Sequence, residues 1–226
     1  MSKVLILANS SSGLYDFRNE LLLRLLQEGH EVLTSLPDDA RTKEIAAQGC
    51  RVIHTDINRR GMNPLQDLKL VKAYRKLLKS EKPDLVITYT IKPNIYGGYL
   101  CRKFHIPYIT TITGLGSTFE REGLMKKMII WMYRAGLKEC ECIFFQNAEN
   151  RAIFRSFGIC GQQERLVGGS GVDLRKHTPE AYPGHADDVT RFVYIGRLMK
   201  EKGTEEYLSA AEALHEKYGD RVSIAT

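Results

Sequence analysis

The sequence has no long hydrophobic run. Its apolar stretches, such as residues 4–8 and 128–133, are far shorter than the roughly 18 residues that a membrane-spanning helix needs. We therefore expect neither a membrane-spanning helix nor a signal peptide, and we expect a cytoplasmic location. The five cysteines form no C-x-x-C pair and have no histidine at zinc-ligand spacing, so the pattern favours reduced thiols.

Several catalytic signatures are missing as well. The sequence contains no D-x-D motif, whose carboxylates commonly bind a metal ion that bridges to phosphate. It also contains no H-E-x-x-H or G-x-S-x-G motif, so the common metalloprotease and serine hydrolase sites are not indicated. The absence of G-x-G-x-x-G disfavours a nucleotide-binding oxidoreductase or epimerase. The six histidines are scattered and are interpreted as structural. We expect no bound metal and no cofactor.

The composition is that of a soluble globular chain. Hydrophobic residues make up 43% and charged residues 27%, which excludes a disordered or fibrous protein and allows a substantial core. Lys and Arg number 33 against 27 Asp and Glu, a net charge of +6. This surplus suits an anionic partner but is too small to choose among phosphate, nucleic acid and a membrane surface.

Short apolar segments alternate with helical patterns from the start of the chain. The strand-like segments are KVLIL, EVLTS, RVIHTD, DLVITYT, PYITTIT and CIFFQN, and residues 65–81 show a clear helical period. Near-continuous apolar strands separated by helices predict an α/β fold with a doubly wound parallel sheet. Ligands bind such sheets where strands end and helices begin.

The alternation of strand-like and helical segments stops after residue 168. Residues 168–188 carry four Gly and two Pro, which indicates a linker. We predict a first domain over residues 1–168, a linker over 169–188, and the truncated start of a second domain over 189–226. This last segment contains a strand, a helix and a second strand, and such a β-α-β start does not close a core.

Two loops are candidate anion sites. The loop at residues 9–13 is rich in small residues before a helix, so Ser12 and Gly13 are placed to meet a phosphate or sugar; the alternative is an ordinary strand-to-helix turn. In residues 196–203, GRLMKEKG, Arg197 and Lys202 can converge on one diphosphate beside Gly196. The alternative there is a solvated, charged turn.

Two further loops follow predicted strands. Gly114 and Gly116 lie beside hydroxyl residues at a strand's carboxyl end, where a ligand is expected, although glycine-rich connections are common. Lys92 occupies the same position after the preceding strand, where it can meet an anion. The alternative interpretation is that it is a surface lysine before a helix that starts with proline.

The helical pattern at residues 123–139 is both apolar and basic. Met125, Met128, Ile129, Trp131 and Met132 form an apolar surface flanked by lysines and arginines. This pattern fits a helix lying on an anionic membrane or one packed against the sheet, and the flanking charges favour partial membrane contact.

Seven segments together resemble glycosyltransferase family 4, the retaining enzymes of GT-B fold, and within it the members that build capsular or lipid-linked oligosaccharides. They cover the chain in order at residues 15–32, 58–64, 82–97, 106–119, 144–159, 168–174 and 196–203. The resemblance implies two Rossmann-like domains across a cleft, the first mainly holding the acceptor and the second the nucleotide-sugar.

The resemblance also assigns roles to residues. Arg197 and Lys202 would hold the donor diphosphate and act in catalysis, with Ser12, Gly13 and Gly196 beside the donor. Arg59, Lys92, Gly114 and Gly116 would face the acceptor. Thr113, the third catalytic candidate, stands where many relatives carry a histidine, so a hydroxyl takes the place of an imidazole there. The E-x7-E segment that contacts the donor lies in the family's second domain, and we expect this chain to end before reaching it.

We therefore expect a glycosyltransferase that moves a sugar, with retention, from a nucleotide-diphosphate sugar to a polyprenyl-linked or polysaccharide acceptor in bacterial envelope synthesis. We expect these 226 residues alone to have little activity. The expected partners are the two substrates and, peripherally, the anionic inner face of the plasma membrane, with no nucleic acid. The alternative is a non-catalytic membrane-docking subunit of a split glycosyltransferase.

Overall fold

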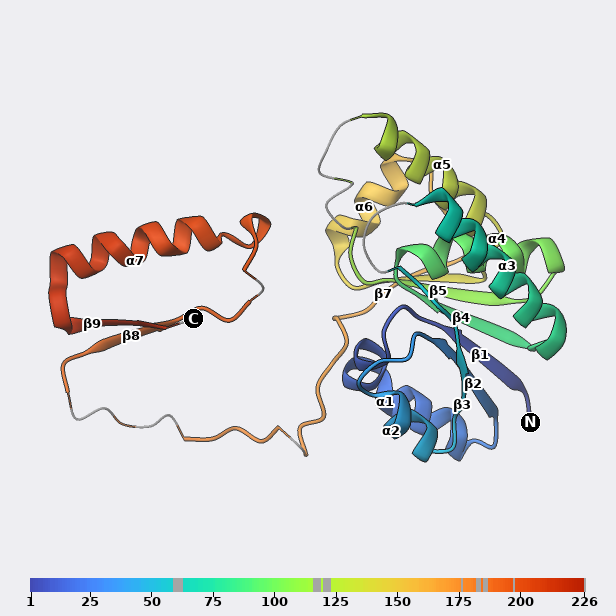
Figure 1. Cartoon of the computed structure of the whole chain (residues 1–226), viewed down its shortest axis with the longest axis horizontal. Coiled ribbons are helices and arrows are strands. Elements are labelled where there is room, and N and C mark those ends of the chain that lie inside the picture. The colour runs from blue at the N-terminus through green and yellow to red at the C-terminus, as the bar shows by residue number, and fades with distance from the viewer. Residues whose placement is uncertain are drawn as a thin grey trace. The chain divides into compact units, whose positions relative to one another are not determined.

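The chain divides into two compact units, Met1–Asp173 and Leu174–Thr226 (Figure 1). The computed structural model describes residues 1–58, 63–115, 119, 123–175, 177–181, 184, 187–196 and 198–225. Each unit is described by itself.

Unit 1 is built on a sheet of parallel strands. Their order across the sheet is β3-β2-β1-β4-β5-β6-β7, and every neighbouring pair is parallel. The strands are β1 (Lys3–Leu7), β2 (Glu31–Leu36), β3 (Arg51–His54), β4 (Leu85–Tyr89), β5 (Tyr108–Ile112), β6 (Cys142–Phe145) and β7 (Glu164–Leu166). The predicted α/β fold with a doubly wound parallel sheet is confirmed.

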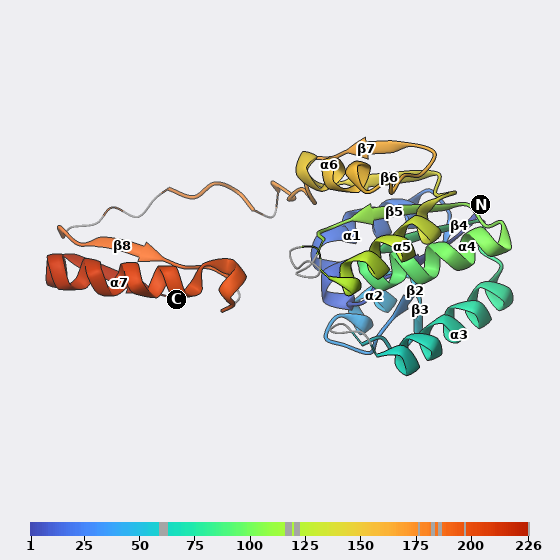
Figure 2. The same ribbon diagram turned by 90° about the horizontal axis from the view of Figure 1, so that it is seen from above.

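Helices cover both faces of this sheet (Figure 2). They are α1 (Ser11–Gln27), α2 (Thr42–Ala47), α3 (Pro64–Glu81), the π-helical turn η1 (Pro93–Gly97), α4 (Gly98–Phe104), α5 (Leu124–Leu137) and α6 (Ala148–Ser156). One core cluster joins the sheet to α1 and α2, and the other joins it to α3, α4, α5 and α6.

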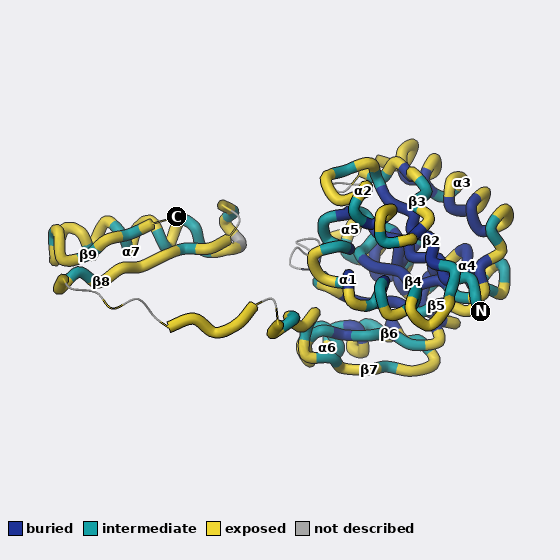
Figure 3. Tube along the Cα trace, turned by 90° about the horizontal axis from the view of Figure 1, so that it is seen from below, coloured by how far each residue is buried: buried dark blue, intermediate teal, exposed yellow. Residues whose placement is uncertain are grey.

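The apolar run of β1 shows why both faces need cover. Val4 and Ile6 pack toward α1 and α2, whereas Leu5 and Leu7 pack toward α3 and α4. All four are buried, because successive side chains of a strand point to opposite faces. The buried strands form the centre of unit 1 in Figure 3.

Two glycines let the helices of one layer approach closely. A Cβ atom on Gly98 would lie 2.5 Å from the carbonyl oxygen of Gly136, and one on Gly136 would lie 2.8 Å from that of Ile95. The buried hydroxyl of Tyr108 donates to the same Gly136 carbonyl at 2.7 Å. The backbone of η1 and α4 therefore packs directly against α5.

Unit 2 has the predicted β-α-β order. It contains β8 (Thr190–Val193), the 3-10 turns η2 (Lys200–Lys202) and η3 (Gly219–Arg221), α7 (Thr204–Tyr218) and β9 (Val222–Ala225). β8 and β9 are parallel neighbours, and α7 has no buried residue. Between β7 and β8 the described residues form no helix or strand, which is the range where a linker is predicted. The predicted domain boundaries stay a prediction.

The described residues also bear on two expectations from the sequence. No helix among them is both long and apolar enough to cross a membrane. All five cysteines are free thiols, and Cys50, Cys101 and Cys140 are buried. Burial raises the pKa of the Cys50 thiol to about 11.

Candidate active-site edge

The strand order places a topological switch point at the carboxyl ends of the strands of unit 1. From β1 the chain proceeds outward through β2 to β3, and from β4 it proceeds in the other direction to β7. β1 and β4 are neighbours, so their carboxyl ends form the switch point at which doubly wound sheets bind ligands. The connections after β1, β4 and β5 meet at this edge, where the sequence places most of the candidate residues of this unit.

The loop after β1 is held by a carboxylate of the chain itself. The backbone N–H of Ser11 donates to Asp39 at 3.0 Å, and its hydroxyl also donates to Asp39. Ser10 caps α1, because its side chain accepts from the N–H of Gly13 at 3.2 Å. Ser12 and Gly13 are half-buried beside this arrangement. Asp39 thus supplies an anion at the helix start, and a donor role for Ser12 and Gly13 stays a prediction.

Lys92 is held in an ion pair. Its ammonium lies 2.7 Å from the Asp67 carboxylate, and the two side chains are only 14% and 9% exposed. Asp67 comes from the first turn of α3, which Asn63 caps. Burial raises the pKa of the Tyr96 phenol, and the neighbouring Asp67 carboxylate raises it further. Lys92 is therefore not the solvated surface lysine of the alternative interpretation, and its acceptor role stays a prediction.

The ends of β4 and β5 carry a second polar cluster. Tyr89 pairs in register with Thr111, and the guanidinium carbon of Arg18 lies 5.2 Å from the centre of the Tyr89 ring. Burial raises the pKa of the Tyr89 phenol, while Arg18 and a hydrogen bond with Thr111 oppose that rise. Beyond this cluster Thr113 is exposed and Gly114 is half-buried. Apart from its two chain neighbours, no described residue has an atom within 4 Å of a Cβ placed on Gly114.

The predicted diphosphate loop of unit 2 is organised by two hydroxyl groups. Tyr194 Oη donates to the Lys202 carbonyl at 3.2 Å, and Thr204 Oγ1 accepts from the N–H of Met199 at 3.0 Å. A Cβ on Gly196 would lie 3.1 Å from Tyr194 Oη, so the loop passes close to this ring. Gly196 and Lys202 are exposed. Their donor role stays a prediction.

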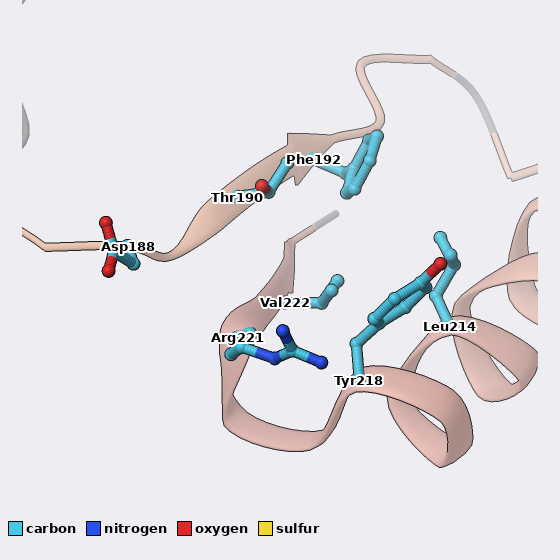
Figure 4. A pocket seen from close by; sticks show the side chains of 7 residues that line it. All are labelled: Asp188, Thr190, Phe192, Leu214, Tyr218, Arg221 and Val222. Atoms are coloured by element: carbon cyan, nitrogen blue, oxygen red, sulfur yellow. The ribbon is translucent and has the colours of Figure 1, made fainter.

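Unit 2 also has an open pocket of about 290 Å³, shown in Figure 4. It is lined by Asp188, Thr190, Phe192, Leu214, Tyr218, Arg221 and Val222. Thr190 and Val222 are the first residues of β8 and β9, whereas Gly196 and Lys202 follow the carboxyl end of β8. The pocket therefore lies at the opposite strand ends from the predicted diphosphate loop and is a separate feature.

Three predicted site residues, Arg59, Gly116 and Arg197, lie outside the described residues. In the part of the chain that the structure describes, no group of three or more His, Cys, Asp or Glu side chains is arranged to hold a metal ion.

Sequence reasoning missed Asp67, Tyr89 and Arg18. Asp67 carried a visible signal, because it lies in the first turn of a helix that starts with Asn63 and Pro64, but its partner is 25 residues away. Arg18 lies within one of the seven family-like segments, yet nothing local shows that it faces the end of β4. These contacts depend on how the strands are ordered.

Comparison with known proteins identifies the family. The family described as "Glycosyl transferase 4-like" matches residues 3–147 of the 226. The chain belongs to the glycosyl transferase 4-like family. The match covers β1 to β6 and therefore the whole candidate edge of unit 1, which confirms the resemblance to family 4.

Two curated relatives of this glycosyl transferase 4-like chain are named for lipid-linked acceptors. The N,N'-diacetylbacillosaminyl-diphospho-undecaprenol alpha-1,3-N-acetylgalactosaminyltransferase of Campylobacter jejuni is 24% identical over 93% of the chain and 60% of its own length. The UDP-Gal:alpha-D-GlcNAc-diphosphoundecaprenol alpha-1,3-galactosyltransferase of Escherichia coli is 23% identical over 70% of the chain and 43% of its own length. The chain thus spans less than two thirds of either relative.

Solved structures share the fold of this family member. The sucrose-phosphate synthase of Thermosynechococcus elongatus matches with a TM-score of 0.70 and 19% identity, over 99% of the chain and 70% of the synthase. At this identity the likeness shows the fold alone.

Proposed function

We propose that the chain is part of a retaining glycosyltransferase of bacterial envelope synthesis. It would move a sugar from a nucleotide-diphosphate sugar to a polyprenyl-linked or polysaccharide acceptor, with unit 1 holding the acceptor. The observation that carries the proposal is the family match over residues 3–147, which falls on the unit whose strand order has a switch point between β1 and β4. The names of two relatives, both with diphospho-undecaprenol acceptors, support the acceptor class.

In this proposal the cations of unit 2 stabilise the negative charge of the leaving diphosphate. Negative charge grows on the leaving diphosphate as the glycosidic bond breaks, and Lys202 and Arg197 would meet that charge. A fixed donor at such a position contributes about 2.7–4 kcal/mol to transition-state stabilisation. The proposal needs no metal ion, so a chelator is not expected to change ligand binding or transfer. Thr113, exposed at the end of β5, would hydrogen-bond a sugar hydroxyl.

A thermal-shift panel on the purified chain tests the acceptor class. A short-chain polyprenyl diphospho-sugar at a hundred times its Kd is expected to stabilise the chain by about 2.7 kcal/mol, with or without EDTA. Polyprenyl alcohol of the same length is the control and should give no shift. If no polyprenyl diphospho-sugar shifts the transition, the acceptor assignment is wrong. Transfer that appears only when a second chain is supplied would favour the docking-subunit alternative.

We also propose that the protein contacts the membrane through helix α5. Ile129 is buried in the core, contrary to the sequence-based apolar surface that included it, and Met132 packs against the core as well. Leu124, Met125, Met128 and Trp131 remain exposed, and Trp131 is 67% exposed. The helix thus packs on the sheet with one face and presents large apolar side chains on another.

The charge of the surrounding layer supports an anionic surface as partner. Residues 63–82, 98–106 and 123–139, which contain α3, α4 and α5, carry twelve Lys and Arg against three Asp and Glu. Two of the three acids, Asp67 and Glu81, are paired with Lys92 and Arg51. Residues 11–48, on the other face of the sheet, carry four Lys and Arg against seven Asp and Glu. The basic surplus therefore lies on the α5 side.

Vesicle binding tests the membrane contact. The chain is expected to co-sediment with vesicles that contain phosphatidylglycerol more strongly than with phosphatidylcholine vesicles, and added salt should weaken the binding. Changing Met128 and Trp131 to Ser removes about 3 kcal/mol of apolar burial, or roughly a hundredfold in partition. Phe17→Ser, on an exposed aromatic of α1, is the matched control. Equal binding by both variants would show that α5 does not enter the lipid.

A further inference from the structure

Arg18 lies at the switch-point edge of unit 1. It belongs to α1, which starts directly after β1, and its guanidinium lies over Tyr89, the last residue of β4. Its side chain is half-buried. Side chains of a helix point back toward its N-terminus, so a long residue two turns into α1 reaches the strand ends from which the helix departs.

The charge of Arg18 is not matched by a carboxylate. At the same edge Lys92 lies 2.7 Å from Asp67, and Arg41 lies 2.9 Å from Glu44. Within residues 1–58, 63–115 and the other described ranges, Arg18 has no ion pair, and its Nη1 donates to the Phe17 carbonyl at 2.6 Å. A guanidinium has five N–H donors, so donors remain for an anionic ligand.

The position of Arg18 is set by the strand pairing. Tyr89 and Thr111 are partners in the β4–β5 register, so their side chains lie on the same face of the sheet as α1. The Tyr89 ring supports the guanidinium at 5.2 Å from its centre. Thr113, for which a sugar-binding role is proposed, follows β5 directly and is exposed. Arg18 lies over the last residue of β4, and β4 is the neighbour of the strand that leads to Thr113.

The residue after Tyr89 is strained. Thr90 has a φ of 71°, a left-handed conformation that β-branched residues rarely adopt. Its buried hydroxyl oxygen has no hydrogen-bond partner among the described residues. Strain of this kind persists where the surrounding structure imposes it and gathers at functional sites. Thr90 directly follows Tyr89, the last residue of β4, so this strained residue lies at the same strand end as Arg18.

We propose that Arg18, supported by Tyr89, binds the diphosphate of the lipid-linked acceptor. The proposal rests on the proposed function, because it takes the acceptor class from there. A planar guanidinium engages phosphate oxygens through two parallel hydrogen bonds, and stacking on Tyr89 orients that plane before the ligand arrives. Lys92 is less available to a phosphate than Arg18 is, because its ammonium already donates to the Asp67 carboxylate. Arg18 is then a ligand-binding residue for the acceptor.

Equilibrium binding with two probes tests this assignment. The probes are a ten-carbon polyprenyl diphospho-N-acetylglucosamine and the uncharged ten-carbon alkyl N-acetylglucosaminide. Arg18→Met keeps the side chain's stem over Tyr89 but removes the charge, and it is expected to weaken the diphosphate probe roughly 10- to 100-fold. The uncharged probe should bind equally to both proteins. Arg18→Lys should recover part of the affinity, because it restores charge without the planar fork.

Arg24→Gln is the matched control on the same helix, since Arg24 is paired with Glu28 and its side chain is 71% exposed. It should bind both probes as the wild type does, and circular dichroism should show all variants folded. If Arg18→Met binds the diphosphate probe as tightly as the wild type, Arg18 is only a packing partner of Tyr89. If the wild type binds neither probe, the proposed function fails and the Arg18 assignment fails with it.

Discussion

Replacing Phe154 by alanine is expected to lower the free energy of unfolding of unit 1 by about 4 kcal/mol. The Phe154 ring is fully buried where α6 meets the sheet. Its centre lies 5.1 Å from that of Tyr133 and 5.5 Å from that of Phe145, both in edge-to-face contact, and 6.0 Å from that of Phe119. Each aromatic pair contributes about 0.5–1.5 kcal/mol beyond the free energy of burying its apolar area. Removing the Phe154 ring should therefore cost more stability than removing a buried ring that makes no aromatic contacts.

Urea denaturation followed by far-UV circular dichroism measures this loss. Phe17→Ala is the matched control, because that ring is 58% exposed on α1 and its removal is expected to change stability by less than about 0.5 kcal/mol. Phe154→Leu keeps most of the volume and should cost less than the alanine variant. A destabilisation below 1 kcal/mol for Phe154→Ala would mean that α6 does not pack as the structure shows.

The fold could be predicted from the sequence because the strong signals were local. Each of the six apolar segments overlaps one of the strands β1 to β6, and the central strands β1 and β4 are buried on both faces. β7 (Glu164–Leu166) was missed, since its sequence ERL has no apolar run and the strand lies at the edge of the sheet. An edge strand needs less burial, so its pattern is weak.

The contacts of the site could be predicted only in part. The rule that ligands bind at strand ends placed Ser12, Lys92 and Gly114 on one edge without any coordinates. It did not show that Asp39, 28 residues from Ser11, would cap the helix start. Such pairs join elements that are far apart in the sequence, and the choice of partner follows from strand order and register.

The ion pair of Lys92 and Asp67 carries the second large expected effect. Asp67→Asn leaves the ammonium of Lys92 in a site where that side chain is only 14% exposed. Removing one partner of a buried pair costs about 3–5 kcal/mol, and we expect about 3 kcal/mol because both side chains keep slight contact with solvent. Lys92→Met should cost a similar amount, since it leaves the Asp67 carboxylate, only 9% exposed, without its cation beside the Tyr96 phenol.

Removing both charges together should restore most of the lost stability. The double variant Asp67→Asn, Lys92→Met has no buried charge, so its net cost is expected to be about 1 kcal/mol, and the difference from additivity measures the coupling. Urea denaturation gives all four values of the cycle. Additive losses would mean that the two side chains do not face each other as the structure shows.

Acceptor binding by the same variants separates structural support from direct contact, because the two roles predict different affinities in folded protein. If Lys92 only holds the start of η1 in place through its ion pair with Asp67, the double variant should bind a polyprenyl diphospho-sugar within about threefold of the wild type. The variant leaves no unpaired charge at that position, and Arg18 is unchanged. If Lys92 contacts the acceptor's anion, as the family resemblance implies, the double variant should lose about tenfold or more. Affinity measured well below the unfolding temperature therefore decides whether the acceptor diphosphate meets one cation at this edge or two.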